Sequence, residues 1–405
     1  MKKVFVIGCG PSGMMAAIMS SLKGNEVVIF EKNDRPGKKL MITGKGRCNI
    51  TNSASIKEII ENTPTNGKFL YSALNGFSNA DLIDFFNKNG LMTKVERGGR
   101  VFPVSDKAID VLDVLLRLIK ENHIEIRFNS KVTDILIDGK CVKGIIVNGK
   151  KEFCDSLILA SGGKSYPSTG STGDGYDMAK KLGHKIVEPH PALVPLVTFE
   201  DVSEMMGLTL KNINAKLCIN GKLVREEFGE MLFTHFGLSG PVILTLSSFF
   251  KTVEDGDVVI KIDLKPALNH EKLDERLQRD FKKYSKKELK NSLNDLLPRS
   301  LIPYVIRVSS LNPDKRVSEL SKAERGALVN VIKDLAFRIK SKRSINEAII
   351  TSGGVSTKEI NPKTMESRLI KGLFFAGEII DVDALTGGFN LQISFSTGYL
   401  AGINS

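Results

Sequence analysis

The hexapeptide GCGPSG at residues 8–13 constrains this 405-residue chain more than any other feature. It follows a short β-branched run, KVFVI at residues 3–7, which is typical of a buried strand. It opens a segment with helical spacing that ends at Gly24, and a second apolar run follows at residues 27–30. A strand, a helix and a strand in this order predict a βαβ unit and therefore a parallel sheet.

The glycine spacing in this turn is the G-x-G-x-x-G pattern of dinucleotide-binding folds. Gly8 allows the tight turn, Gly10 lets the backbone approach a pyrophosphate, and Gly13 allows the helix and the strand to pack closely. Pro11 and Ser12 begin the helix, whose first turn offers unpaired N–H groups and the positive end of its dipole to phosphates. We therefore expect a dinucleotide to bind at this turn.

A carboxylate follows the second strand in the position that such folds use. Glu31 lies 18 positions after Gly13, where an acidic side chain binds ribose hydroxyls. Because a carboxylate repels a 2′-phosphate, it disfavours NADP at this site. It does not separate NAD from FAD.

The chain then departs from the course of an NAD dehydrogenase, which normally continues into further βα units. Residues 37–52 read GKKLMITGKGRCNITN, without the periodicity of a strand or an amphipathic helix. Such a loop lies over the cofactor cleft when it follows the carboxyl end of a strand. It supplies cations for a pyrophosphate, glycines for close backbone approach and an amide for a flavin edge, namely Lys38, Lys39 and Arg47, then Gly44 and Gly46, and Asn49. A solvated basic loop is the alternative.

Two later segments favour FAD. ASGG at residues 160–163 follows a buried strand, as expected of a second crossover near the adenine half of a cofactor. Near the end of the chain, a strand ends in Gly377 and Glu378, and glycines 387 and 388 lead into a helix. The amides at the start of that helix would face the flavin and stabilise charge on the reduced ring. Glu378 would then lie near the ribityl chain or the pyrophosphate.

Seven segments, in order over nearly the whole chain, carry a wider pattern: VIGCGPSGMMAA (6–17), EKNDRPGKKLMITGKGRCNITN (31–52), GGRVFPVSDKA (98–108), ASGGKSYPSTGSTGDGY (160–176), MLFTHFGLSGPVIL (231–244), TSGGV (351–355) and FFAGEIIDVDALTGGFNLQ (374–392). The chain resembles the flavoprotein family with two dinucleotide-binding domains that includes dehydro-bile-acid reductase and aminoacetone oxidase-like proteins. The resemblance implies FAD, an insert with a β-barrel-like part and a helical part, and oxidoreductase chemistry. It leaves the substrate open. Ser161 departs from the family pattern, in which threonine is commoner.

FAD is thus the predicted cofactor, with NADH or NADPH as a transient electron donor. No second G-x-G-x-x-G is evident for a pyridine nucleotide, which could instead stack on the flavin face. The pattern and the resemblance together predict cofactor contacts at Gly8, Gly10, Pro11, Ser12, Gly13, Glu31, Lys32, Lys38, Lys39, Gly46, Arg47, Asn49, Val132, Ala160, Ser161, Gly162, Gly377, Glu378, Gly388, Phe389, Asn390 and Leu391.

The candidate catalytic residues are His235 and Tyr166. Histidine exchanges protons near neutral pH, so His235 in FTHFGLSGP is the first candidate acid or base. Tyr166 in KSYPSTG could donate to a substrate carbonyl. A structural histidine in the insert and a packing tyrosine beside Pro167 are the alternatives. Cys48 has no resolving cysteine nearby, which argues against a redox role.

The reaction follows from the cofactor. A hydride would pass from NAD(P)H to the flavin and then to an electrophilic carbon of a small or hydrophobic substrate, such as the β-carbon of an enone. The reverse direction, from an amine to the flavin and on to oxygen, uses the same groups. A flavin-dependent tRNA-modifying enzyme and a non-catalytic flavin-binding module remain as alternatives.

The order of elements predicts a Rossmann-like α/β fold of the glutathione-reductase type, interrupted by an insert. The FAD-binding domain comprises residues 1–189 and 346–405. Short strands predict a β-rich insert domain over 190–269 with 336–345, and charged helical spacing predicts a helical subdomain over 270–335.

Composition narrows the class of protein. Five scattered cysteines and five histidines form no metal-ligand or disulfide pattern, so we expect no metal and a reducing cytoplasm. No apolar run is long enough to span a membrane. The net charge of +12 favours anionic partners, but solvated helix faces explain it more simply than nucleic acid does. We expect a small-molecule substrate, no nucleic acid and no membrane partner, with the oligomeric state open.

Overall fold

The computed structural model describes residues 1–405, apart from the side chain of Asp255. The chain divides into two compact units, one formed by Met1–Ala192 with Ile345–Ser405 and the other by Leu193–Ser344. Among the described residues, no helix is both long and apolar enough to cross a bilayer. The finer division of the insert into a β-rich and a helical domain stays a prediction.

The first unit is built on a five-stranded parallel sheet in the order β19-β10-β1-β2-β6. The sequence places β-branched and aromatic residues on both faces of these strands, and β10 and β19 are buried along their whole length. Such continuous apolar runs are typical of parallel strands covered on both sides. The strands are β1 (Lys3–Ile7), β2 (Glu26–Phe30), β6 (Glu125–Arg127), β10 (Ser156–Leu159) and β19 (Leu373–Phe375).

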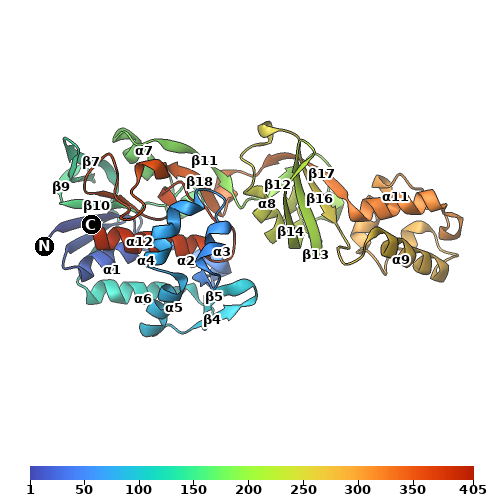
Figure 1. Cartoon of the computed structure of the whole chain (residues 1–405), viewed down its shortest axis with the longest axis horizontal. Helices are drawn as coiled ribbons and strands as arrows, with labels where there is room; N and C mark the ends of the chain where they lie inside the picture. Colours follow the sequence, from blue (N-terminus) through green and yellow to red (C-terminus); the bar gives the residue numbers. More distant parts are fainter. The chain divides into compact units, whose positions relative to one another are not determined.

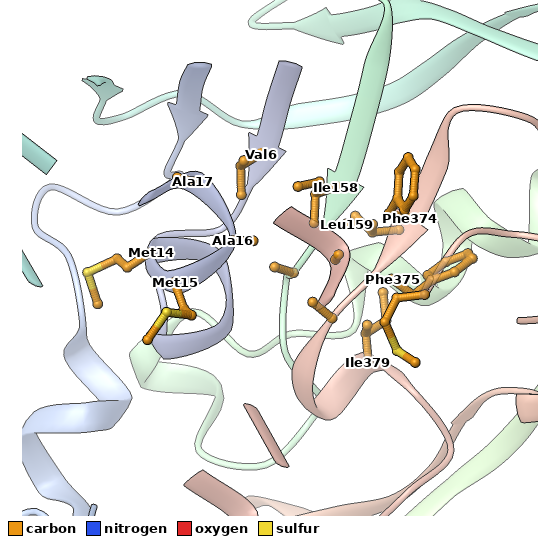
Figure 2. Packing of buried hydrophobic residues seen from close by; sticks show 14 of the residues in the cluster. Val6, Met14, Met15, Ala16, Ala17, Ile158, Leu159, Phe374, Phe375 and Ile379 are labelled. Carbon is orange, nitrogen blue, oxygen red and sulfur yellow. The ribbon is translucent and has the colours of Figure 1, made fainter. Parts of the chain in front are cut away.

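Two helices from opposite ends of the chain pack against this sheet and against each other. They are α1 (Pro11–Leu22) and α12 (Phe389–Asn404), which lie side by side (Figure 1). Figure 2 shows side chains from α1, such as Met15, in one core with Val6 of β1, Ile158 of β10 and Phe374 of β19. The carboxyl-terminal helix is therefore part of the same core as the first βαβ unit.

Further helices and three small sheets complete the first unit. The helices include α2 (Lys38–Ile42), α6 (Ala108–Glu121) and α7 (Asp174–Lys181). The small sheets are β3 (Thr51–Asn52), β5 (Arg100–Pro103) and β4 (Thr93–Glu96); β7 (Val132–Asp138), β8 (Cys141–Val147) and β9 (Lys150–Phe153); and β11 (Ile186–Ala192) with β18 (Ile350–Val355).

The second unit contains a closed six-stranded barrel in the order β12-β15-β14-β13-β16-β17, closed by pairing of β12 with β17. Alternating apolar residues in β16 and β17 fill its interior: Val258, Ile260 and Ile262 of β16 are buried, and the residues between them are partly exposed. The strands are β12 (Leu196–Thr198), β13 (Thr209–Ile219), β14 (Lys222–Phe233), β15 (Gly237–Ser239), β16 (Val258–Asp263) and β17 (Leu335–Lys342). Helices α8 (Pro241–Ser247), α9 (His270–Lys283), α10 (Ile302–Val308) and α11 (Lys322–Lys333) accompany it (Figure 1). The predicted Rossmann-like α/β fold with a barrel-containing insert is confirmed.

Candidate functional site

A pocket opens in the first unit at the carboxyl ends of β1, β2 and β10. Its empty volume is about 1250 Å³, including the part that is open to solvent. Open α/β sheets bind ligands at this edge, where neighbouring strands on either side of β1 connect in opposite directions. Many of the predicted cofactor contacts line the pocket: Gly8, Gly10, Pro11, Ser12, Glu31, Lys32, Lys38, Lys39, Val132, Ala160, Ser161, Gly162, Glu378, Asn390 and Leu391.

The glycine turn adopts the geometry that its sequence requires. Gly8 has φ +103°, and a Cβ on it would lie 2.5 Å from the carbonyl oxygen of Ala160. A Cβ on Gly13 would lie within 3.0 Å of the Gly8 carbonyl oxygen, so Gly13 serves the packing of α1 on β1 and does not line the pocket. A Cβ on Gly10 would meet no heavy atom within 4 Å. The side of Gly10 is therefore open, as close approach of a ligand to the backbone requires.

Glu31 is held rigidly at the end of β2. Its Oε2 accepts from the Cys9 N–H at 2.8 Å, and its Oε1 accepts from the backbone N–H of Asn33 at 2.8 Å and from Asn33 Nδ2 at 2.7 Å. The residue is 8% exposed and lines the pocket. Three donors fix its orientation, while the carboxylate keeps capacity for a further hydrogen bond.

One buried hydroxyl in the pocket wall lacks a partner. Ser161 Oγ makes no hydrogen bond to any described residue, although it is buried. It lies between Ala160 and Gly162, which also line the pocket. A Cβ on Gly175 would lie 2.0 Å from this oxygen, so the hydroxyl faces the first turn of α7 and not the open space of the pocket. The open backbone at Gly10 and the carboxylate of Glu31 in the same lining make the pocket fit a dinucleotide cofactor.

The side chains of Lys39 and Glu378 meet in the pocket wall. Lys39 Nζ donates to Glu378 Oε2 at 2.6 Å and to Ser165 Oγ at 2.7 Å. Glu378 Oε1 accepts from the Thr351 N–H at 2.9 Å and from Ser165 Oγ at 3.0 Å. Lys39 lies in α2 and Thr351 in β18, so this network joins distant parts of the chain. Lys32 forms a second ion pair at the pocket, with Asp174 at 2.8 Å.

The segment at 37–52 divides between the pocket and its surroundings. Lys38, Lys39 and Thr43 line the pocket. Arg47 does not, because its guanidinium donates to Glu96 and to Asp106 and lies 4.1 Å above the Phe102 ring. These carboxylates raise the pKa of Arg47 further above its usual range. The geometry thus gives Arg47 a role in fixing the loop to the β4–β5 hairpin.

A left-handed turn follows α2 in the same segment. Gly44, Lys45 and Gly46 have φ values of +57°, +60° and +84°. Gly46 and Asn49 are not among the described residues that line the pocket, and Asn49 Oδ1 is a second buried oxygen without a partner there. A Cβ on Gly388 would lie 2.9 Å from Asn49 Oδ1. The turn therefore brings Asn49 to the start of α12.

The predicted cofactor contacts near the carboxyl terminus also fall into two groups, those that line the pocket and those that lie beside it. Asn390 and Leu391 line the pocket, and Asn390 also bridges the loop before α12 by donating to the Ala384 carbonyl and accepting from the Ala384 N–H. Gly377, Gly388 and Phe389 belong to the surroundings of the pocket: the two glycines have φ +77° and +100°, and Phe389 is buried in the core.

The two catalytic candidates do not line the pocket described here. Tyr166 precedes Pro167 with φ +52°, between the lining segments 160–162 and 169–171. His235 lies in the second unit, in the loop between β14 and β15, where its exposed ring packs edge-on against Phe236 at 4.9 Å. Their catalytic roles stay predictions.

Several lining residues were not predicted from the sequence. They are Ile7, Cys9, Phe30, Asn33, Gly37, Leu40, Thr43, Ser130, Lys131, Thr169, Gly170, Ser171, Asp174, Met178, Ile349, Ile350 and Ser394. The run STGSTGDG at 168–175 was a usable signal, because it repeats the glycine-rich composition of the first turn.

Cys48 is buried, which raises the pKa of its thiol to about 12, so it is a protonated thiol at neutral pH.

The amino-acid sequence was compared with protein families and with known proteins. A family model described as "HI0933-like protein Rossmann domain" matches residues 2–404. A 3-dehydro-bile acid delta(4,6)-reductase from Clostridium scindens is 30% identical over 408 residues, covering 99% of this chain and 98% of that protein. A ribosomal RNA dihydrouridine synthase from Escherichia coli is 29% identical, covering 97% of this chain and 95% of that protein.

Among solved structures, the 3-ketosteroid delta1-dehydrogenase from Sterolibacterium denitrificans superposes with a TM-score of 0.52 at 14% identity. The alignment covers 99% of this chain and 98% of that one. At this identity the likeness concerns the fold alone.

Proposed function

The chain belongs to the HI0933-like Rossmann family of FAD-binding oxidoreductases, and we propose that it reduces a carbon–carbon double bond conjugated to a carbonyl, with NADH or NADPH as electron donor. The observation that carries this proposal is a similarity over nearly the whole chain to two enzymes with different substrates but one chemistry.

The shared chemistry follows from the two names. A delta(4,6)-reductase acting on a 3-dehydro bile acid saturates double bonds conjugated to a ketone. A dihydrouridine synthase saturates the C5=C6 bond of uracil, which is conjugated to the C4 carbonyl. In each case the double bond is conjugated to a carbonyl, directly or through a second double bond, which activates its far carbon toward a hydride and leaves its near carbon to take a proton. An activated double bond is therefore the substrate feature that the two relatives share.

FAD bound in the pocket would supply the hydride chemistry. The residues of the pocket supply the binding groups: the open backbone at Gly10 and the first turn of α1 for phosphates, and Glu31 for ribose hydroxyls. Leu40 and Leu391 add apolar side chains to the same lining. These contacts are the basis for assigning this pocket to FAD.

The reaction also needs a proton donor, and His235 and Tyr166 stay our candidates. A neutral phenol or an imidazolium can donate a hydrogen bond to the substrate carbonyl and a proton to the α-carbon. Tyr166 belongs to the loop whose next turn, Thr169–Ser171, lines the pocket. His235 belongs to the insert, in the loop between β14 and β15.

A uracil base in ribosomal RNA is a second candidate substrate beside a small enone. It is favoured by the net charge of +12 and by exposed lysines in the last turn of α9 and just after it, which include Lys282, Lys286 and Lys287. Basic surfaces attract phosphate backbones, and their contribution falls steeply with salt. A small hydrophobic enone needs no such surface.

The proposal is tested with the purified protein under anaerobic conditions. We expect yellow protein that releases FAD on denaturation, bleaching by NADH or NADPH, and recovery of colour with a conjugated enone or with uridine-containing ribosomal RNA. Mass spectrometry shows which of the two candidates is the substrate, because the one that is reduced gains two hydrogens. Bleaching by an amine, with recovery of colour only on admission of oxygen, would show an oxidase instead. Bleaching without recovery by any acceptor would favour a non-catalytic flavin module.

A further inference from the structure

We propose that Lys39 is the cation that contacts FAD in this pocket and that Glu378 is a positioning residue, which acts on the cofactor through Lys39. This inference rests on the proposed function, because it assumes that the pocket holds FAD. It differs from the sequence-based expectation, in which Glu378 itself lies against the ribityl chain or the pyrophosphate.

The first step is that the oxygens of Glu378 are already engaged by the protein. Oε1 accepts from the Thr351 N–H at 2.9 Å and from Ser165 Oγ at 3.0 Å, and Oε2 accepts from Lys39 Nζ at 2.6 Å. The side chain is 11% exposed. Three donors from three separate segments hold a carboxylate far more firmly than a single surface contact. Glu378 is therefore oriented toward the protein side of the pocket wall.

The second step concerns the hydrogens of Lys39. An ammonium group has three N–H donors. Among the described residues, Lys39 uses two of them, for Glu378 Oε2 at 2.6 Å and for Ser165 Oγ at 2.7 Å. Lys39 lines the pocket and its side chain is 22% exposed. The third N–H is thus available to an acceptor in the pocket, and FAD offers anionic phosphate oxygens.

The third step is the position of the network within the pocket. A Cβ on Gly377, the neighbour of Glu378, would lie 2.9 Å from the Cβ of Ser12, which is in the first turn of α1. That turn is the expected site of the pyrophosphate. Ser165 is buried behind the wall, and its hydroxyl contacts both members of the pair. Lys39 lines the same pocket as Gly10 and Ser12, so a cation fixed there faces the space in which the phosphates would bind.

The charges of Lys39 and Glu378 determine in which direction each substitution should change FAD affinity. If Lys39 is removed, Glu378 becomes a largely buried carboxylate without a cation, in the wall of the pocket that would hold the phosphates of FAD. An unpaired buried charge is costly, and it also repels an anionic ligand. Neutralising Glu378 should then improve FAD binding in the absence of Lys39. A carboxylate that bound the cofactor directly would behave in the opposite way.

The experiment is a double-mutant cycle on FAD affinity. Apoprotein of the native chain, K39M, E378Q and the double variant is titrated with FAD, and the thermal unfolding of each apoprotein is measured. We expect K39M to weaken binding by at least about tenfold and E378Q in the native background to change it by less than about threefold. The K39M/E378Q protein should bind FAD more tightly than K39M alone. The K39R variant, which keeps the cation, should stay near the native affinity.

An equal loss of FAD affinity on E378Q with and without Lys39 would overturn the inference, because it would mean that Glu378 binds FAD itself. Native affinity in K39M would also overturn it. If K39M apoprotein does not fold, S165A decides: loss of the bridging hydroxyl should weaken FAD binding, and an unchanged affinity contradicts the positioning network. These titrations need no substrate. Native protein that does not bind FAD would refute the proposed function, whereas native binding with an additive cycle would refute only this inference.

Discussion

Gly398 of α12 lies so close to Ser12 of α1 that a Cβ on the glycine would come within 3.0 Å of the Ser12 carbonyl oxygen. A Cβ on Gly402, one turn later, would approach the carbonyl oxygen of Ala16 in the same way. The two helices therefore cross at their backbones, and the end of the chain fixes the helix whose first turn forms part of the pocket.

Substitution of Gly398 by alanine tests this crossing. Alanine favours a helix over glycine by up to about 1 kcal/mol, but here the methyl group must push α12 away from α1. We expect G398A to lower the unfolding temperature and to weaken FAD binding. The matched control is G326A in α11, where a Cβ would meet nothing within 4 Å. The control should be neutral or stabilising; equal behaviour of the two variants would argue against a tight crossing.

The glycines of the first turn should separate folding from cofactor binding. A Cβ on Gly10 has open space, whereas Gly8 combines φ +103° with a 2.5 Å approach to the Ala160 carbonyl oxygen. We expect G10A apoprotein to unfold at the native temperature while its FAD affinity falls by about tenfold, equivalent to about 1.4 kcal/mol. G8A should lower the unfolding temperature itself. Native FAD affinity in G10A would contradict the assignment of the pyrophosphate to this turn.

Glu31 can be tested by removing one acceptor oxygen with its charge, or by removing the whole carboxylate. E31Q keeps one acceptor oxygen, whereas E31A leaves the Cys9 N–H and the Asn33 N–H without their partner. We expect both variants to weaken FAD binding, since hydrogen bonds to charged groups contribute about 1.5–3 kcal/mol. In E31Q the amide nitrogen must face either the Cys9 N–H or the two Asn33 donors, so both variants should also destabilise the apoprotein. The measurements are FAD titration by fluorescence and urea unfolding.

His184 should make the stability of the first unit depend on pH. Burial lowers the pKa of its imidazole below the ordinary value of 6.5, and Nε2 lies 2.8 Å from Ser367 Oγ. The folded state therefore binds fewer protons than the unfolded state, so the stability contributed by neutral His184 is present above pH 6.5 and is lost as the pH falls toward the lowered pKa. Urea unfolding at pH 7.5 and pH 5.5 should show a larger loss in the native protein than in H184Q. Equal losses would mean that other groups carry the dependence.

The sequence was sufficient for those parts of the site that depend on local backbone geometry. The strand, the glycine turn and Glu31 lie within one βαβ unit, so their spacing alone predicts where they meet. It was not sufficient for Arg47, whose partners Glu96 and Asp106 lie 49 and 59 residues away. A cation in a glycine-rich loop looks the same in sequence whether it binds a phosphate or a carboxylate.

The same limit applies to the Lys39–Glu378 pair, which is 339 residues apart in the chain. Each residue was predicted to contact the cofactor, because each lies at the end of a strand-and-loop pattern. Their mutual contact depends on how β18, β19 and α2 pack together. The residues next to Lys39 or Glu378 in the sequence do not predict that packing. Tertiary pairing of charges therefore decides which predicted ligand is free to bind.

The role of His235 can be tested by separating the two halves of the proposed reaction. We expect H235A to bind FAD and to be bleached by NADH or NADPH at the native rate, because its side chain lies in the insert and does not line the cofactor pocket described here. Reoxidation of the reduced protein by a conjugated enone should slow by roughly 100-fold or more, the usual contribution of a general acid. The matched control is H270A, an exposed histidine at the start of α9 in the same unit. If H235A and H270A are reoxidised at the native rate, the proton comes from elsewhere, and Y166F becomes the decisive variant.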